Sequence, residues 1–140
     1  MQPTHVPLRL ATGAFILNSG VSKLGADEGT AQFLHGAAAG TYPAVFGDMS
    51  PRRFAKLLAY SEIAVGAALL APMVSATVAG AALTGFGASL MGMYFKTPSM
   101  TQDDGIRPSQ EGTALAKDVW LVGAGLTLLG QGLAKRRRTE

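Results

Sequence analysis

The sequence has no cysteine, few charged residues and few aromatic residues. Cysteine is absent from all 140 residues, which excludes thiol catalysis, iron–sulfur clusters and Cys-ligated zinc. Charged residues make up 15% of the chain, well below the roughly 25% of an ordinary soluble domain. Because 48% of the residues are hydrophobic and gather in long runs, we expect residues 1–140 to form a single all-α domain that crosses a membrane several times.

The basic residues are not spread over a nucleic-acid-binding surface. The net charge is +3, but four of the twelve basic residues stand together near the C-terminus, directly after an apolar run. No basic stripe with interleaved aromatics is present elsewhere, so no nucleic-acid partner is expected. A terminal basic cluster is typical of an anchor on the cytoplasmic side of a membrane. We therefore expect a cytoplasmic tail at 135–140, anchored by Lys135, Arg136, Arg137 and Arg138.

Four apolar runs have the length of membrane spans. They cover about 7–24, 54–71, 74–95 and 113–134. The short connection after Ala71 forces the second and third runs into an antiparallel hairpin. The expected fold is a polytopic, antiparallel four-transmembrane-helix bundle in the inner (plasma) membrane, with both termini cytoplasmic. A secretory signal peptide is a rival interpretation of the first run, but Asn18 and Lys23 interrupt the run.

The segment 26–50 is too short and too interrupted by Gly and Pro to cross a bilayer. We interpret it as an interfacial or re-entrant excursion that ends at Pro43, with a short helix over 31–38 capped by Thr30. His35 in this segment has no second His, Cys or carboxylate at ligand spacing, so no metal site is expected.

Polar residues inside the apolar runs form the candidate functional site. Arg9 and Lys23 share one helical face of the first run, because the residues between them on that face, Gly13, Ile16 and Gly20, follow at spacings of three and four. Glu62 lies near the middle of the second run, where a charge costs on the order of 2.5–3.5 kcal/mol. These residues are therefore expected to face the interior of the bundle.

The partners of these polar residues are only partly predictable. With both termini on one side, Lys23 and Asp118 lie at the same level and are expected to pair. For Glu62 the alternatives are Asn18, Arg9, Lys23 or a protonated carboxyl. The candidate buried cluster either fastens helices together or binds a quinone head group, a proton or a polar cargo group. Its members are Arg9, Asn18, Lys23, Glu62 and Asp118.

The third run has no charged residue and repeats a small residue at every fourth position. This spacing predicts a face that another helix can approach closely. We expect the partner to be another integral membrane protein or a second copy of the chain. The helix-packing groove comprises Ala76, Gly80, Thr84, Ala88 and Gly92.

Several short motifs resemble the DoxX-like family of small four-helix integral membrane proteins. They are Arg9-x3-Gly13, Gly20-x2-Lys23-Leu24, Glu62 followed by Gly66-x2-Leu69-Leu70, and Lys117-Asp118 before a last run rich in Gly and Leu. The resemblance covers most of the chain and implies an accessory or integral membrane subunit, sometimes near quinone chemistry. The chain departs from thiol–disulfide relatives because it has no cysteine.

Three functional hypotheses follow. The first is a non-catalytic integral membrane subunit or assembly factor of a larger membrane complex, such as a respiratory or redox-linked one. The alternative is a quinone-linked oxidoreductase membrane subunit that uses the polar cluster around Glu62, with quinone as its only cofactor. The third is a small-solute transporter, for which four spans are few unless the protein dimerises. In each case the chain is not expected to carry catalytic residues of its own.

Overall fold

The computed structural model describes residues 1–139, and over this range the chain is helical with no β-strand. The two short 3-10 helices and seven α-helices are η1 (Pro3–His5), α1 (Val6–Lys23), α2 (Glu28–Thr41), α3 (Pro43–Phe46), α4 (Pro51–Leu70), α5 (Ala76–Lys96), η2 (Pro98–Met100), α6 (Thr113–Ala116) and α7 (Val119–Arg137).

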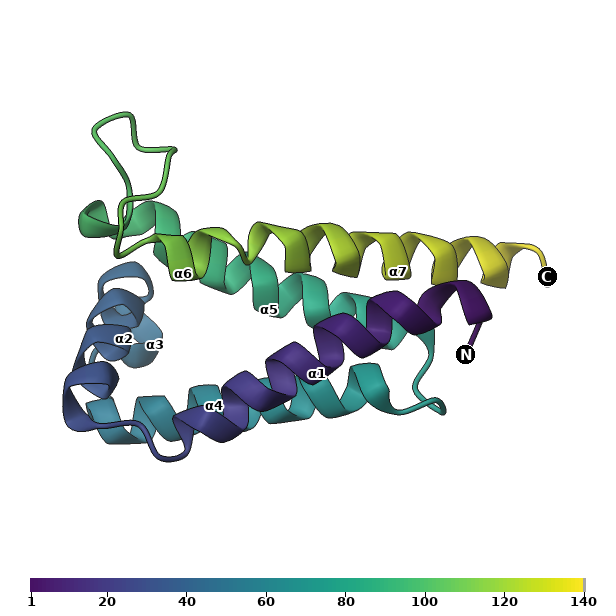
Figure 1. Ribbon diagram of the computed structural model, residues 1–140, viewed down its shortest axis with the longest axis horizontal. Helices are drawn as coiled ribbons and strands as arrows, with labels where there is room; N and C mark the ends of the chain where they lie inside the picture. The colour runs from purple at the N-terminus through teal and green to yellow at the C-terminus, as the bar shows by residue number, and fades with distance from the viewer. Residues whose placement is uncertain (140) are drawn as a thin grey trace.

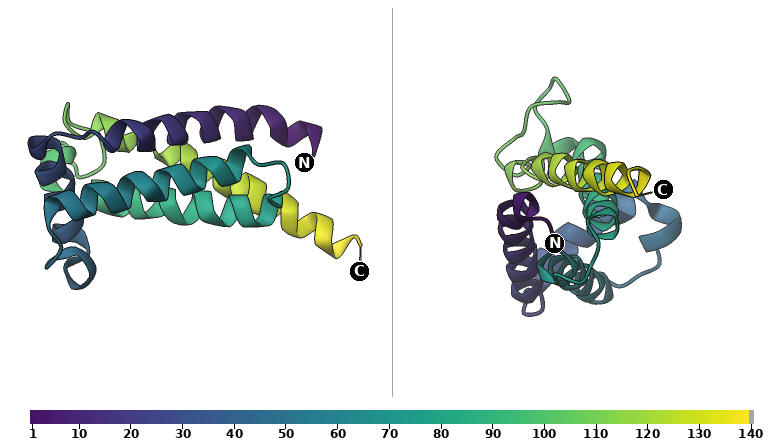
Figure 2. Two further views of the ribbon diagram at one scale, coloured as in Figure 1. Left: turned by 90° about the horizontal axis from the view of Figure 1, so that it is seen from below. Right: turned by 90° about the vertical axis from the view of Figure 1, so that its right-hand side faces the viewer.

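The four longest of these helices run side by side along the long axis of the molecule (Figures 1 and 2). They form two closely packed pairs, α1 with α4 and α5 with α7, and the two pairs contact each other less than the helices within a pair do. Both termini lie at one end of the assembly, as the sequence predicts, and α2 and α3 lie across the other end (Figure 1). The two ends of the bundle therefore offer different chemical surroundings.

Side-chain caps fix where three of the helices begin. The side chains of Asp27, Ser50 and Ser75 accept hydrogen bonds from backbone amides three residues later, at the starts of α2, α4 and α5. The prediction that Thr30 caps a helix over 31–38 is wrong, because Asp27 provides the cap and α2 extends over Glu28–Thr41. An aspartate cap is stronger there, since its charge also favours the helix N-terminus.

The last apolar run is not one continuous helix. Residues 113–134 were expected as a single span, but the helix breaks at Lys117 and Asp118, between α6 and α7. Backbone amides at the break donate to carbonyls three residues earlier, which tightens the turn. The break aims Asp118 at the bundle interior, where it is only 6% exposed.

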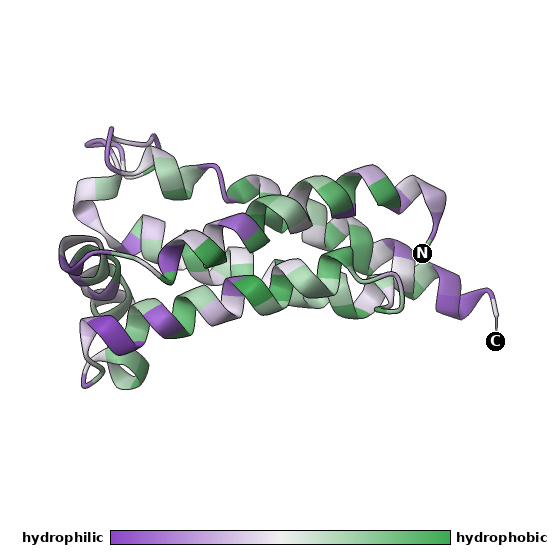
Figure 3. Cartoon of the chain, turned by 60° about the horizontal axis from the view of Figure 1, so that its bottom comes forward, coloured by the Kyte–Doolittle hydropathy of each residue, from purple (hydrophilic) through white to green (hydrophobic). Residues whose placement is uncertain are grey.

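Two helical stretches are long and apolar enough to cross a membrane. They are Ala76–Lys96 and Thr113–Arg137, and only 39% and 28% of their most apolar windows is buried within the chain. Much of their apolar surface therefore faces outward. The hydropathy colouring in Figure 3 shows that apolar residues also extend over α1 and α4.

The polar connection between α5 and α6 is held by one carboxylate. Asp104 Oδ1 accepts from the amides of Ile106 and Arg107 at 2.9 Å each, and Oδ2 accepts from Arg107 Nε at 2.5 Å. Gly105 takes a positive φ of 69° in this turn, a conformation that glycine adopts without a steric cost. The turn is fastened to α5 because the Tyr94 hydroxyl donates to Ile106 O at 2.7 Å.

This turn is expected to loosen only in strong acid. The Arg107 side chain and the two amides lower the pKa of Asp104 from 3.8 to about 2. Because the folded-state pKa is depressed, the contribution of Asp104 to stability is present above pH 3.8 and is lost as the pH falls towards 2. NMR shifts of the Ile106 and Arg107 amides should therefore titrate with a midpoint near pH 2. Asp104→Asn should abolish that titration, and a midpoint near the ordinary value would contradict the interpretation.

Candidate functional site

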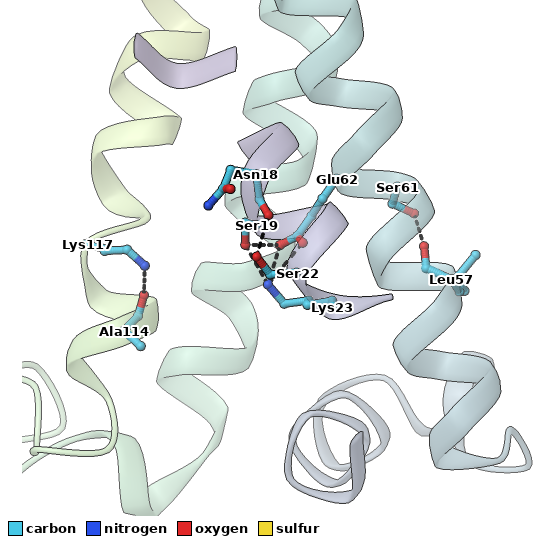
Figure 4. A network of polar contacts seen from close by, with 9 residues as sticks. All are labelled: Asn18, Ser19, Ser22, Lys23, Leu57, Ser61, Glu62, Ala114 and Lys117. Atoms are coloured by element: carbon cyan, nitrogen blue, oxygen red, sulfur yellow. Dashed lines mark hydrogen bonds and ion pairs between the residues drawn. The ribbon is translucent and has the colours of Figure 1, made fainter. Parts of the chain in front are cut away.

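A buried ion pair joins α1 to α4. The Lys23 ammonium lies 3.1 Å from each carboxylate oxygen of Glu62 and donates to Ser19 Oγ at 2.7 Å. Ser19 Oγ in turn lies 3.3 Å from Glu62 Oε1 (Figure 4). Glu62 is 5% exposed. Among residues 1–139 its Oε2 has no partner in hydrogen-bonding geometry, although it lies within ion-pair distance of the Lys23 ammonium. One carboxylate oxygen is thus left with hydrogen-bonding capacity.

Glycines bring the backbones of α1 and α4 close enough for this pair to form. A Cβ built on Gly20 would lie 2.7 Å from Ala59 O and 2.9 Å from Glu62 Cβ. One turn along, a Cβ on Gly66 would lie 2.7 Å from Leu17 N. Because no side chain separates the helices at these positions, the short Ser19 hydroxyl and the Lys23 stem both reach the Glu62 carboxylate.

Asp118 contributes a second buried carboxylate to the same region. The expected Lys23–Asp118 pair is wrong, because within residues 1–139 the ion pair of Lys23 is with Glu62. The Asp118 side chain makes no hydrogen bond or salt bridge to the described residues. Its neighbour Lys117 donates to Ala114 O at 2.6 Å, and its ammonium lies 5.0 Å from the centre of the Phe15 ring. Lys23 therefore pairs with the carboxylate on α4, the helix that packs most closely against α1.

A cavity of about 210 Å³ lies beside these groups. Lys23, Glu62, Lys117 and Asp118 provide its polar wall, and apolar residues complete it, among them Ile16, Leu58, Phe86 and Leu90. A second hollow, of about 250 Å³, lies between α1 and α7 and is almost entirely apolar. The cavity and this second hollow share four wall residues, namely Phe15, Lys117, Asp118 and Leu121.

Two members of the predicted cluster lie elsewhere. Asn18 is on the exposed side of α1, and its backbone carbonyl, not its side chain, accepts from Ser22. Arg9 is 1% exposed but lies near the terminal end. It donates to the carbonyls of Ala68, Leu69, Ala71 and Val74 over 2.6–3.0 Å. Arg9 therefore caps the C-terminus of α4, and neither residue is a partner of Glu62.

The predicted helix-packing groove is largely filled by α7 of the same chain. A Cβ on Gly80 would contact Leu129 N and lie 2.8 Å from Gly125 O. A Cβ on Gly125 would lie 2.6 Å from Thr84 N. Ala88 is exposed, Ala76 is half-buried, and Gly92 faces the hydroxyl of Tyr42, the residue between α2 and α3. The predicted close approach of another helix is therefore confirmed at Gly80 and Thr84, where the neighbour is α7 of the same chain. An external partner elsewhere on α5 stays a prediction.

Some residues of the site were missed by sequence reasoning. Ser19 stands one helical turn before Lys23, a spacing that predicts contact on one face, so the sequence did contain a signal for it. Lys117 is part of the Lys117-Asp118 motif in the sequence, but the pattern gives it no predicted place in the cluster. His35 lies with Nε2 2.9 Å from Phe46 O, and no group of three His, Asp or Glu side chains gathers in residues 1–139.

No protein-family model matches the chain, and no curated protein or solved structure is significantly similar to it.

Proposed function

We propose that the chain is a multi-pass membrane protein that holds the head group of a quinone-class lipid beside Glu62, as a membrane subunit of a redox-linked complex. In this proposal α1, α4, α5 and α6–α7 are four transmembrane segments, α2 and α3 form an interfacial layer, and the termini are cytoplasmic. The observation that carries it is the buried Glu62 carboxylate beside a cavity, because its Oε2 has no hydrogen-bond partner among residues 1–139.

Membrane insertion is supported by the apolar character of the exposed helix surfaces. Large side chains point outward from all four long helices, among them Leu10, Val21, Leu57, Val78, Leu126 and Leu133. In water such a surface would be a liability, whereas in lipid it is solvated. Trp120, which is 76% exposed, is of the type that collects at membrane–water interfaces.

The donors and acceptors of the cavity fit a quinone in both redox states. A quinone carbonyl accepts hydrogen bonds, which the ammonium groups of Lys23 and Lys117 can donate. A quinol hydroxyl donates hydrogen bonds, which Glu62 Oε2 and the Asp118 carboxylate can accept. A few polar groups on an otherwise apolar wall is the usual composition of a small-molecule site.

The second hollow offers a route for a lipid-soluble molecule. It lies between α1 and α7, and Ala11, Thr12 and Trp120 extend its walls beyond those shared with the cavity. An apolar tail lying there would leave a polar head at Asp118 and Glu62. The helix break at Lys117 also fits this arrangement, because irregular backbone at membrane depth is tolerated where it lines a cavity.

The small-residue groove supports a docked partner helix less well than the cavity supports a bound head group, because α7 fills the centre of the groove at Gly80. The chain still acts without catalytic residues of its own. Its contribution is to bind and orient the head group and to offer a carboxylate for proton exchange.

Quinone binding is expected to quench the fluorescence of the single tryptophan, Trp120, because this residue lines the second hollow. Titration of the protein in phosphatidylcholine nanodiscs with a short-chain benzoquinone should give saturable quenching. The matching quinol, whose hydroxyl can donate to Glu62, should displace the benzoquinone and reverse the quenching. Glu62→Gln keeps the shape of the side chain but removes its charge, so the affinity for the quinol should fall about tenfold, the loss of one charge-assisted hydrogen bond.

The matched control is Glu28→Gln, which makes the same chemical change at an exposed position in the first turn of α2. Its quenching curve should superimpose on that of the unmodified protein. Quenching that rises without saturation would mean that the quinone merely partitions into lipid, and displacement by the quinol that is identical in Glu62→Gln would mean that Glu62 does not contact the head group. Either result would overturn the proposal.

A further inference from the structure

A separate cavity, which the proposed function does not use, lies at the end of the bundle where the chain begins, away from the interfacial helices α2 and α3. It has a volume of about 360 Å³ and lies where η1, the turn between α4 and α5, and the end of α7 meet. Its walls include His5, Arg9, Lys135 and Arg136, and no Asp or Glu of residues 1–139 is among them. Within the described part of the chain, the walls of the cavity therefore carry positive charge without a carboxylate.

His5, on the wall of this cavity, has a ring nitrogen that lacks a hydrogen-bond partner. The His5 side chain is 4% exposed, and its buried Nε2 has no hydrogen-bond partner among residues 1–139. A buried polar atom of this kind normally finds a partner, since leaving it unsatisfied costs about 1–3 kcal/mol. A ligand oxygen in the cavity that His5 lines would supply that partner.

The N-terminus of α5 faces the same space. Ala76 and Thr77 line the cavity, and their backbone amides donate no hydrogen bond to any residue of 1–139. Helix α5 has 21 residues, so its N-terminal amides carry a partial positive charge that favours anions. Arg9 adds a buried guanidinium whose four hydrogen bonds all go to backbone carbonyls, which leaves its charge without a carboxylate.

We propose that this cavity binds a phosphate group, held by the α5 amides, His5, Lys135 and Arg136. The shared chemistry is a phosphate oxyanion, which either a phospholipid head group or a free phosphate ion can present. In the proposed membrane orientation the cavity lies at the level of the lipid head groups, because Met1 and the first two residues of the basic tail, Lys135 and Arg136, line it. Lys135 and Arg136 of the basic tail would then bind one phosphate group at a defined site, in addition to the non-specific attraction of the tail to an anionic membrane surface.

The test compares two double variants that remove the same charge from the same tail. Lys135→Gln with Arg136→Gln changes two residues of the cavity wall, whereas Arg137→Gln with Arg138→Gln changes two tail residues outside it. Protein from nanodiscs of mixed phosphatidylcholine and phosphatidylglycerol is analysed by native mass spectrometry for retained lipid. We expect selective retention of phosphatidylglycerol, reduced about tenfold or more in the first variant and less than about threefold in the second.

Inorganic phosphate distinguishes the two sources. If phosphate raises the thermal stability of the detergent-solubilised protein and displaces the retained lipid, the site accepts free phosphate; if it does neither, the site is specific for a lipid head group. His5→Leu should abolish retention of either ligand. Equal losses in the two double variants, or no selective retention together with no effect of phosphate, would show diffuse electrostatic attraction only and overturn the proposal.

Discussion

Replacing Arg9 by leucine is expected to lower the free energy of unfolding by about 3–5 kcal/mol, the largest effect of any single substitution considered for this chain. The guanidinium binds three carbonyls at the end of α4, those of Ala68, Leu69 and Ala71, and a fourth, Val74 O, in the turn that follows. The carbonyls at a helix end have no partner within the helix. Leucine would leave this group of buried acceptors unsatisfied and would also free α1 from the turn between the two helix pairs.

Equilibrium unfolding of the detergent-solubilised protein measures this loss. Arg9→Lys should recover only part of it, because a compact ammonium cannot reproduce the planar fork of donors that reaches four carbonyls. Arg53→Leu removes the same charge from an exposed position of α4 and should change the stability by less than about 0.5 kcal/mol. An Arg9→Leu protein as stable as the Arg53→Leu control would show that the carbonyls find water, and that Arg9 has another role.

The helices were predictable because their signals are local. Ser50 followed by Pro51, and Ser75 before an apolar run, are start signals that act within one helical turn. They place α4 and α5 within three residues of the predicted runs. The break at Lys117 was not predictable in this way, since no Gly or Pro marks it in the sequence. Its cause is tertiary, in that Asp118 is buried next to the cavity.

The partners of the charged side chains were harder to predict than the helices. Arg9 uses backbone carbonyls, and a sequence pattern contains no mark for a backbone acceptor. Lys23 had two candidate carboxylates, Asp118 at its own level and the deeper Glu62, and the choice follows from Gly20, which brings α1 against α4 rather than α7. Pairing of this kind depends on which helices touch, and hydrophobic runs alone do not determine that.

The second large effect is expected at Gly80, where alanine should lower the free energy of unfolding by about 3 kcal/mol. The added Cβ would contact Leu129 N and lie 2.8 Å from Gly125 O. Both atoms belong to the backbone of α7, so no flexible side chain can move aside, and the two helices must separate along their contact. The closest approach of α5 to α7 would then be lost together with the packing of their neighbouring side chains.

Gly85→Ala is the matched control because it lies on the same helix and has no atom within 4 Å of a built Cβ. Both substitutions raise helix propensity by the same amount, up to about 1 kcal/mol, so the difference between them isolates the contact with α7. Ala88→Leu adds a bulky side chain to an exposed position of the predicted groove and should leave the stability unchanged. If Gly80→Ala were tolerated like Gly85→Ala, while Ala88→Leu alone removed co-purifying membrane proteins, the groove would be a docking surface after all. The opposite pattern is expected, because the small residues of α5 at Gly80 and Thr84 are matched by glycine on α7.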